Sequence, residues 1–189
     1  MLKLIEETIT KEQIYKGRVF VVEKHQILSP DGQHSTREIV VHNGGAAILA
    51  LDQNNFVPMV RQFRLAAGKC ILEVPAGKLE SGETALNCAR RELAEETGCK
   101  AHKWISLGGA YPTPGYSSEQ IHLFLARDLE KGKLDLDDGE FLEVEWYPID
   151  VLYKMVLAGE IIDGKSIQAI LLSKELLDAE AENNCERAE

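Results

Sequence analysis

The sequence has no excess of positive charge and no long run of apolar residues. Its 189 residues include 21 lysines and arginines against 31 aspartates and glutamates, which gives a formal net charge of −10. Proteins that grip nucleic acid by its phosphates are usually basic, so a nucleic-acid partner is disfavoured. A membrane-spanning helix needs about 18 or more consecutive apolar residues, and no stretch approaches that length. We therefore expect no membrane partner either.

Cysteine is scarce, and no targeting segment is evident at the start. The four cysteines, at positions 70, 88, 99 and 185, form no CxxC pair, which argues against a zinc site and a disulfide framework. The opening residues MLKLIEETITKEQ carry acids early and lack a long apolar run. We therefore expect neither a secretory signal nor a transit peptide, and a reducing, cytoplasmic compartment.

An ordinary globular composition is what remains, with 44% apolar and 28% charged residues. Alternating β-branched and aromatic residues predict two strands within 8–28 and another at 36–42, with a Pro-Asp-Gly turn between them. Further strand patterns cover 44–52, 56–64, 70–77, 102–113, 119–129 and 141–149, and the first two of these read as a hairpin. Helical periodicity predicts helices over 84–97, 150–158 and 166–178.

These elements are interspersed rather than strictly alternating, which favours a mixed α/β (α+β) sandwich over a doubly wound parallel sheet. We expect three parts along the chain. They are an N-terminal strand segment at 1–42, a main domain at 43–178 and an acidic, flexible tail at 179–189.

The most informative stretch is GKLESGETALNCARRELAEETG, at 77–98, which places many acids on one helix. At about 100° per residue, Glu92, Glu95 and Glu96 share a face roughly 100° wide. Arg91 can reach Glu95 one turn on, but Glu92 and Glu96 repel each other. Apolar residues beside this face predict that the acids are partly buried, which is costly without a counter-charge. A divalent cation removes that cost, and carboxylates with few nitrogen or sulfur ligands suit Mg²⁺, with Mn²⁺ as a possible substitute.

Mg²⁺ typically bridges carboxylates to the phosphates of a substrate, so the pattern points to phosphoryl chemistry with an activated water. The stretch resembles the Nudix box, G-x5-E-x7-R-E-U-x-E-E-x-G-U, where U is a bulky apolar residue. The matching positions are Gly77, Glu83, Arg91, Glu92, Leu93, Glu95, Glu96 and Gly98. Cys99 at the last position is the one departure, and an accidental charged surface helix is the alternative.

The resemblance implies an α/β/α sandwich, here preceded by an antiparallel strand segment, and hydrolysis of a nucleoside diphosphate linked to another group. It implies that Glu92, Glu96 and the backbone carbonyl of Ala76 are the metal ligands. Glu95 would support them and Arg91 would hold the carboxylates by ion pairs. Glu83 would complete the site.

A second set of motifs narrows the range of substrates that we expect. Pro114 lies 16 residues beyond Gly98, inside YPTPGYSSE, and this loop resembles the ADP-ribose pyrophosphatase subgroup, as do VRQFR, LEVPAGKLE and REIVVHNGGAA upstream. A rigid turn is the simpler reading of YPTPGY. Tyr116 points instead toward dinucleoside polyphosphate hydrolases, but the proline and the upstream motifs outweigh it. The resemblance covers roughly residues 14–172.

Residues that contact the nucleotide in the subgroup match Arg37 and Arg64 here, and Glu38 and Glu73 could assist at the same pocket. Arginine suits this role because it binds phosphate in a bidentate manner and stacks on adenine. The alternatives are surface ion pairs for the arginines and solvent exposure for the glutamates.

The candidates for the general base that activates the water lie on two loops that carry acidic residues. DLDDGEFLEVE resembles the acidic loop of relatives and offers Asp138 and Glu140, although a solvated loop is the alternative. We rank Glu140 first and Glu119, on the PGYSSE loop, second.

The resemblance therefore implies a metal-dependent hydrolase of a nucleotide sugar, ADP-ribose or a close ADP-sugar, that yields AMP and a sugar phosphate. Relatives form dimers through their N-terminal strands, and exposed strand edges favour pairing, so we expect a homodimer. The alternatives are a Nudix hydrolase for GDP-mannose or dinucleoside polyphosphates, a non-catalytic nucleotide-sensing domain, and a partner-binding protein.

Overall fold

The structure is a computed structural model that describes residues 4–133 and 141–186, with side chains up to residue 183. The chain folds into two compact units. Met1–Gly44 and Tyr111–Gln120 form the first, which we call the strand unit, and Gly45–Ala110 and Ile121–Glu189 form the second, which we call the core unit.

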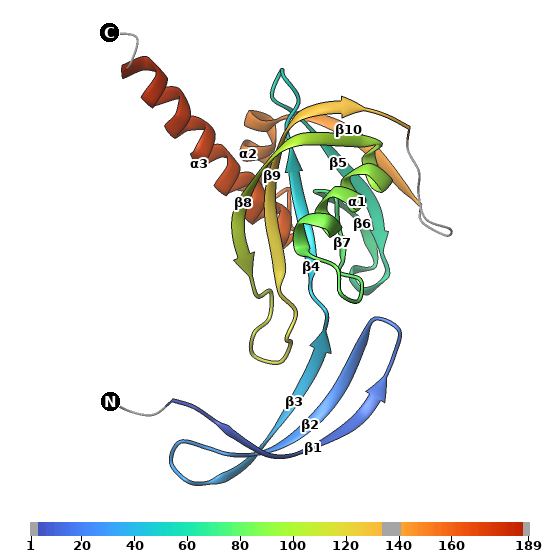
Figure 1. Cartoon of the computed structure of the whole chain (residues 1–189), viewed down its shortest axis with the longest axis vertical. Coiled ribbons are helices and arrows are strands. Elements are labelled where there is room, and N and C mark those ends of the chain that lie inside the picture. The colour runs from blue at the N-terminus through green and yellow to red at the C-terminus, as the bar shows by residue number, and fades with distance from the viewer. Residues whose placement is uncertain (1–3, 134–140, 187–189) are drawn as a thin grey trace. The chain divides into compact units, whose positions relative to one another are not determined.

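Three antiparallel strands make up the sheet of the strand unit, in the order β1-β2-β3 (Figure 1). Their bounds are Glu7–Lys16 for β1, Phe20–Leu28 for β2 and His34–His42 for β3. The turn predicted before β3 is present, and the Ser29 amide donates to the Gln33 carbonyl across it at 2.8 Å. Large apolar side chains of this sheet are exposed, among them Ile9, Ile14 and Phe20.

The loop at 111–120 belongs to the strand unit although it is distant in sequence. The amide of Val40 donates to the carbonyl of Tyr116 at 2.7 Å, and the amide of Ser118 donates to the carbonyl of Val40 at 2.9 Å. The PGYSSE loop is therefore fixed along β3 by backbone hydrogen bonds.

The core unit contains two sheets. The first has the order β7-β4-β9-β8 and comprises β4 (Gly45–Ala50), β7 (Ala76–Lys78), β8 (Cys99–Ala110) and β9 (Ile121–Lys131). The second has the order β10-β5-β6 and comprises β5 (Phe56–Arg64), β6 (Lys69–Glu73) and β10 (Leu142–Pro148), with a 3-10 turn, η1 (Leu65–Ala67), between β5 and β6. The hairpin predicted between 44–52 and 56–64 is wrong. β7 and β9 occupy both edges of β4, so β5 pairs with β6 and β10 instead.

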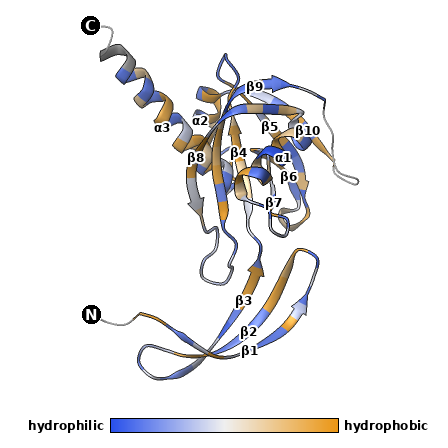
Figure 2. Ribbon diagram, in the orientation of Figure 1, coloured by the Kyte–Doolittle hydropathy of each residue, from blue (hydrophilic) through white to orange (hydrophobic). Residues whose placement is uncertain are grey.

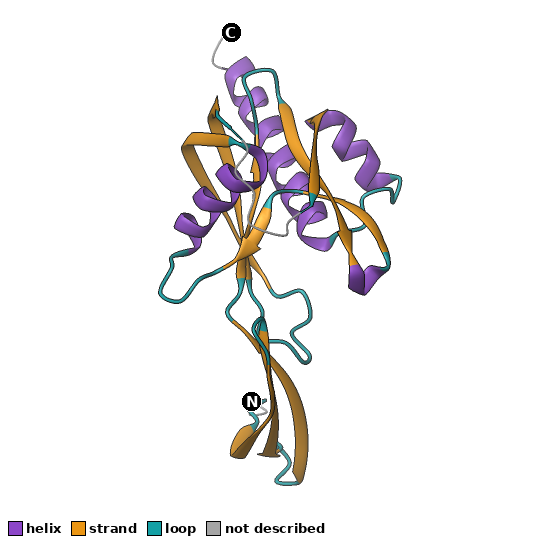
Figure 3. Ribbon diagram, turned by 90° about the vertical axis from the view of Figure 1, so that its right-hand side faces the viewer, coloured by secondary structure: helices purple, strands orange, loops and turns teal. Residues whose placement is uncertain are grey.

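Helices cover both faces of β4, which makes the core unit an α/β/α sandwich (Figure 3). The helices are α1 (Ala85–Thr97), α2 (Ile149–Leu157) and α3 (Gly164–Glu186). Ala46, Ile48 and Ala50 of β4 pack in one apolar cluster with α1, and Ala47 and Leu49 pack in another with α2 and α3. Every residue of β4 is buried, as expected of a strand covered on both sides. The predicted mixed α/β fold is confirmed.

Two helix ends illustrate what local sequence determines. α1 begins after Thr84, whose hydroxyl accepts from the Asn87 amide, and ends at Gly98 in the left-handed conformation (φ 68°). The end predicted for α3 near residue 178 is wrong, because the helix continues to Glu186. Figure 2 shows that α3 carries hydrophobic and hydrophilic residues along its length. Within the described part of the chain, no helix is long and apolar enough to cross a membrane.

Candidate active site

One face of α1 carries the acids predicted from the sequence, and the opposite face holds the helix in the core. Cys88, Ala89 and Leu93 are fully buried in the apolar cluster with β4. This packing fixes the helix axis, so the acids project from a rigid support. Burial, reinforced by the charges of Glu92 and Glu83, raises the pKa of the Cys88 thiol to about 12, so the thiol stays neutral.

Arg91 joins three of the carboxylates through one guanidinium. Its Nη1 donates to Glu92 at 2.7 Å and to Glu95 at 3.0 Å, and its Nε and Nη2 donate to the two oxygens of Glu83 at 3.2 and 3.1 Å. The hydrogen bonds to Glu83 and Glu92 raise the pKa of Arg91, and the same contact with Arg91 lowers the pKa of Glu83. A single cation thus offsets the repulsion among three acids.

Glu92 lies against the backbone of Gly77. A Cβ built on Gly77 would stand 1.8 Å from Oε1 of Glu92, far closer than any real contact. Only glycine leaves room for the carboxylate at this point. The first position of the motif therefore needs glycine because of this close contact, and not because of its backbone angles.

Glu96 is the buried member of the set, with only 5% of its surface exposed. Its Oε2 accepts a hydrogen bond from the amide of Ala76 at 2.9 Å. Glu96 is therefore hydrogen-bonded to β7, the strand that contains Ala76, whose carbonyl is the expected metal ligand. The contact involves the amide of that residue.

A second charged cluster lies in the core unit around Glu73, which is 3% exposed. Arg64 donates from Nε and Nη2 to the two oxygens of Glu73 at 2.7 and 2.8 Å, and Lys165 also donates to Glu73. Burial alone would raise the pKa of Glu73, but these cations outweigh it and hold that pKa below its ordinary value. The predicted substrate residues Arg64 and Glu73 are thus direct partners of each other.

Three residues of this cluster were not predicted from the sequence. Lys165 lies 3.1 Å from Asp163, and the Ser166 hydroxyl donates to Asp163 and accepts from the Val74 amide at 2.8 Å. Asp163 also accepts from the Ser166 amide at 3.0 Å, as an N-cap of α3 does. The feature of the sequence that could have identified these residues is this N-cap, an aspartate just before a helix. The cluster ties the start of α3 to Glu73, at the end of β6, and to Val74, which follows it.

The strand unit holds the other predicted residues. Arg37, on β3, pairs with Glu6 and donates to the Ser35 hydroxyl at 3.1 Å. Glu38 is exposed on the same strand, and Pro114 is exposed in the loop at 111–120. Glu119 lies 3.5 Å from Nδ1 of His42, a contact that becomes an ion pair when the imidazole is protonated. Glu140 and Asp138 lie outside the described residues.

Comparison with known proteins places this arrangement in a family. A model of the NUDIX domain matches residues 41–170, more than half of the chain. The chain belongs to the NUDIX domain family. The ADP-ribose pyrophosphatase of Bacillus subtilis (strain 168) is 41% identical over 184 residues, covering 95% of this chain and 100% of that protein. The methanol dehydrogenase activator of Bacillus methanolicus is 39% identical and covers 90% of this chain and 94% of that protein.

A solved structure described as an ADP compounds hydrolase shares the fold. Its TM-score is 0.81 at 21% sequence identity, and the match covers 93% of this chain and 95% of that chain. The NUDIX domain match and the 41% identical ADP-ribose pyrophosphatase confirm the resemblance of the sequence to the Nudix family and to that subgroup.

Nudix hydrolases generally need a divalent metal ion, and the donors present here fit one. Glu92, Glu95 and Glu96 offer carboxylate oxygens, and the chemistry of Mg²⁺ and Mn²⁺ favours oxygen donors. Among the side chains that the structure describes, at 4–133 and 141–183, no group of three or more acidic, histidine or cysteine residues is placed to hold a metal ion by itself. This is compatible with Mg²⁺, which commonly keeps several waters and uses one or two carboxylates together with substrate phosphates.

The contact between Gly77 and Glu92 predicts the effect of Gly77→Ala. The new methyl group must displace the Glu92 carboxylate, which is the end of a flexible side chain, so the fold tolerates the change. A misplacement of about 1 Å at a reacting centre can cost 10²-fold. We expect kcat/KM to fall by about 10²-fold while Tm changes by less than about 3 °C. Steady-state kinetics and calorimetry measure both, with Gly164→Ala, where the added methyl meets open space, as the control. Equal activity in the two variants would contradict the assigned contact.

Proposed function

We propose that this protein hydrolyses the diphosphate of ADP-ribose, or of a close ADP-sugar, in a divalent-metal-dependent reaction that gives AMP and a sugar phosphate. The observation that carries the proposal is the NUDIX helix α1. Arg91 holds three carboxylates there, and the buried Glu96 is fixed to the strand of Ala76. Similarity to an ADP-ribose pyrophosphatase over its whole length favours this substrate among those of the family.

Glu92, Glu96 and the carbonyl of Ala76 are proposed to hold Mg²⁺, with Mn²⁺ as a substitute. When bound, the metal supplies charge neutralisation at the diphosphate and lowers the pKa of a bound water. Glu95 and Glu83 shape the carboxylate set, and Arg91 keeps these carboxylates oriented while no metal offsets their repulsion. Because α1 is packed into the core, the geometry exists before the substrate arrives.

We further propose that Arg37 and Arg64 bind the nucleotide, assisted by Glu38, Glu73 and the Pro114 loop. The paired cations on Glu73 support this role for Arg64. The two hydrogen bonds from Nε and Nη2 to Glu73 fix the orientation of the Arg64 guanidinium before a phosphate arrives. Glu140 is proposed as the general base and Glu119 as its rival. Glu119→Gln and Glu140→Gln, compared by pH–rate profiles, decide between them.

Two properties of the assembly complete the proposal. The strand unit pairs with that of a second copy, because its exposed Ile9, Ile14 and Phe20 would otherwise remain in water. The homodimer would act in the cytoplasm, and residues 179–189, which include the last part of α3, would not be needed for activity. Analytical ultracentrifugation at micromolar concentration is expected to show a dimer, and a monomer alone would overturn this part.

A substrate panel tests the function. Hydrolysis of ADP-ribose, GDP-mannose, NADH and diadenosine polyphosphates is followed by release of phosphomonoester, with Mg²⁺ and with EDTA. The proposal expects ADP-ribose to be preferred and EDTA to abolish turnover. Preference for GDP-mannose or a dinucleoside polyphosphate would retain the Nudix chemistry and change the substrate. ADP-ribose binding without turnover of any compound would identify a nucleotide-sensing domain.

A further inference from the structure

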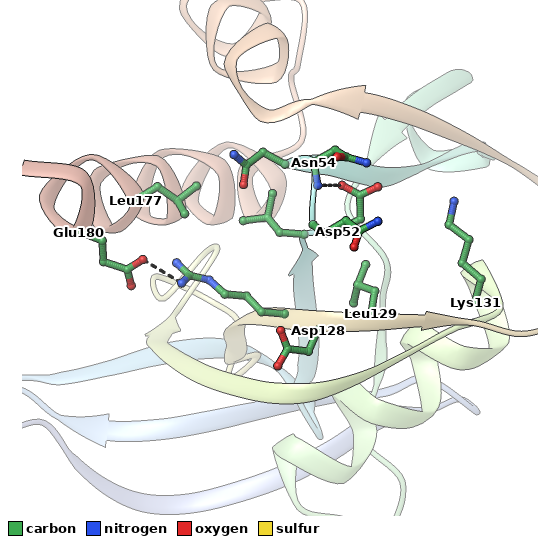
Figure 4. A pocket seen from close by; sticks show the side chains of 11 residues that line it. Asp52, Asn54, Asp128, Leu129, Lys131, Leu177 and Glu180 are labelled. Atoms are coloured by element: carbon green, nitrogen blue, oxygen red, sulfur yellow. Dashed lines mark hydrogen bonds and ion pairs between the residues drawn. The ribbon is translucent and has the colours of Figure 1, made fainter. Parts of the chain in front are cut away.

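A cavity of about 690 Å³ in the core unit contains none of the residues of the candidate active site. It lies among the turn at 52–55, the end of β9 and the helix α3 (Figure 4). Apolar walls come from Leu51, Leu129 and Leu177, and carboxamides come from Gln53 and Asn54. Its volume falls in the range of about 300–1,000 Å³ that is usual for small-molecule sites.

Arg127 lines this cavity and differs from two other arginines of the core unit. Arg61 and Arg64 each place a carboxylate on the edge formed by Nε and Nη2, from Glu145 and Glu73 respectively. In Arg127 both nitrogens of that edge are buried and have no hydrogen-bond partner among the described residues. Only Nη1 is used, and it donates to Glu180 at 2.8 Å, the contact marked by the dashed line at Glu180 in Figure 4.

An unfilled edge of this kind is costly. A buried donor without an acceptor destabilises the fold, more so when it is charged, and native proteins leave few such groups. The Nε and Nη2 donors are parallel and coplanar, so they match two oxygens of one carboxylate or phosphate. The chemistry of the edge therefore specifies an oxyanion.

The acids around the cavity are already engaged. Asp52 accepts from the amides of Asn54 and Phe56, both at 2.8 Å, and Asp128 pairs with Lys103 at 2.8 Å. These contacts reduce the repulsion that an incoming anion would meet. Lys131 adds a further positive charge to the lining.

We propose that this cavity is a binding site for a small molecule with a carboxylate or phosphate group. The oxyanion accepts from Nε and Nη2 of Arg127, and the rest of the ligand lies over Leu51, Leu129 and Leu177. Both nitrogens of the edge are buried, so the Arg127 side chain must turn toward the cavity before a ligand can reach them, and this turn takes Nη1 away from Glu180, which is 48% exposed. Glu180 therefore competes with the ligand for the guanidinium.

The test follows the Nε–H resonance of Arg127 by ¹⁵N NMR in the full chain, with EDTA present and ionic strength held constant with chloride. The probes are sodium phosphate and sodium acetate. Arg127→Met assigns the resonance and removes the edge, Glu180→Gln removes the competitor, and Arg18→Gln on the exposed turn after β1 is the control for loss of charge. Thermal unfolding is measured in parallel.

We expect phosphate or acetate to shift the Arg127 resonance saturably and to raise Tm by about 5–10 °C at 100 times Kd. The probe that does so identifies the phosphate or the carboxylate as the preferred group. Glu180→Gln should bind several-fold more tightly, Arg18→Gln should bind as wild type does, and Arg127→Met should show no rise. An unmoved resonance with both probes would overturn the proposal and assign the edge to ordered water, and an equal Tm rise in Arg127→Met would also overturn it. If Arg127→Met fails to fold, the comparison of wild type with Glu180→Gln decides the matter.

Discussion

Glu96→Gln is expected to lower kcat/KM for ADP-ribose by about 10³-fold while leaving the fold intact. The amide of Gln keeps the shape of the side chain and retains an oxygen that can accept from the Ala76 amide, now 2.9 Å from Glu96. What is lost is the negative charge. A bound metal contributes several kcal/mol of transition-state stabilisation. Each tenfold change in rate corresponds to about 1.4 kcal/mol, so binding the metal with one carboxylate fewer accounts for the predicted loss of activity.

The stability of the same variant distinguishes a metal ligand from a structural acid. Without metal, removing one charge from a crowded set should leave Tm unchanged or raise it, because the repulsion among the carboxylates decreases. Wild type should gain Tm on addition of Mg²⁺, and Glu96→Gln should lose most of that gain. The control is Glu80→Gln, in the same stretch but exposed. A full Mg²⁺ response in Glu96→Gln would contradict the role of Glu96 as a ligand.

Features set by neighbouring residues were predicted well from the sequence. The bounds of α1 follow from Thr84 and Gly98, because a cap and a left-handed terminus depend on a few consecutive residues. The contact of Arg91 with Glu95 follows from the helical repeat. The motif identified Gly77 as a fixed position, and the structure gives the reason as its contact with Glu92.

Features that depend on residues far apart in the sequence were either missed or predicted wrongly. The turn at 53–55 looks like a hairpin turn, but β4 pairs with β7 and β9. The residues of β9 that pair with β4 lie more than 70 positions away from it in the sequence. Lys165 was missed for the same reason. A lysine in a sequence carries no sign that it will meet Glu73, 92 residues earlier, and the contact exists only once α3 packs. The end of α3 was placed too early because an acidic, polar composition was read as a tail.

Arg91→Met is expected to destabilise the metal-free protein by about 1–3 kcal/mol at neutral pH and to lower kcat/KM by about 10–100-fold. The stability loss arises because Glu83, Glu92 and Glu95 keep their charges and lose the guanidinium that joins them. The activity loss is of the size found when a residue that orients metal ligands is removed. Arg90→Met removes a neighbouring but exposed arginine of the same helix and is the matched control.

The pH dependence of this loss gives a sharper criterion. Arg91 lowers the pKa of Glu83 below its ordinary value of 4.5, so the pair stabilises the folded state above that pH and less as the pH falls through the folded pKa. The difference in unfolding free energy between wild type and Arg91→Met should therefore be largest near neutrality and shrink below about pH 4.5, as urea titrations at a series of pH values would measure. Saturating Mg²⁺ at neutral pH should narrow the same difference, because the metal then offsets part of the carboxylate repulsion. A difference that neither acid nor Mg²⁺ reduces would mean that Arg91 acts through apolar packing of its side chain, and that the charge of the guanidinium is not what holds the carboxylates together.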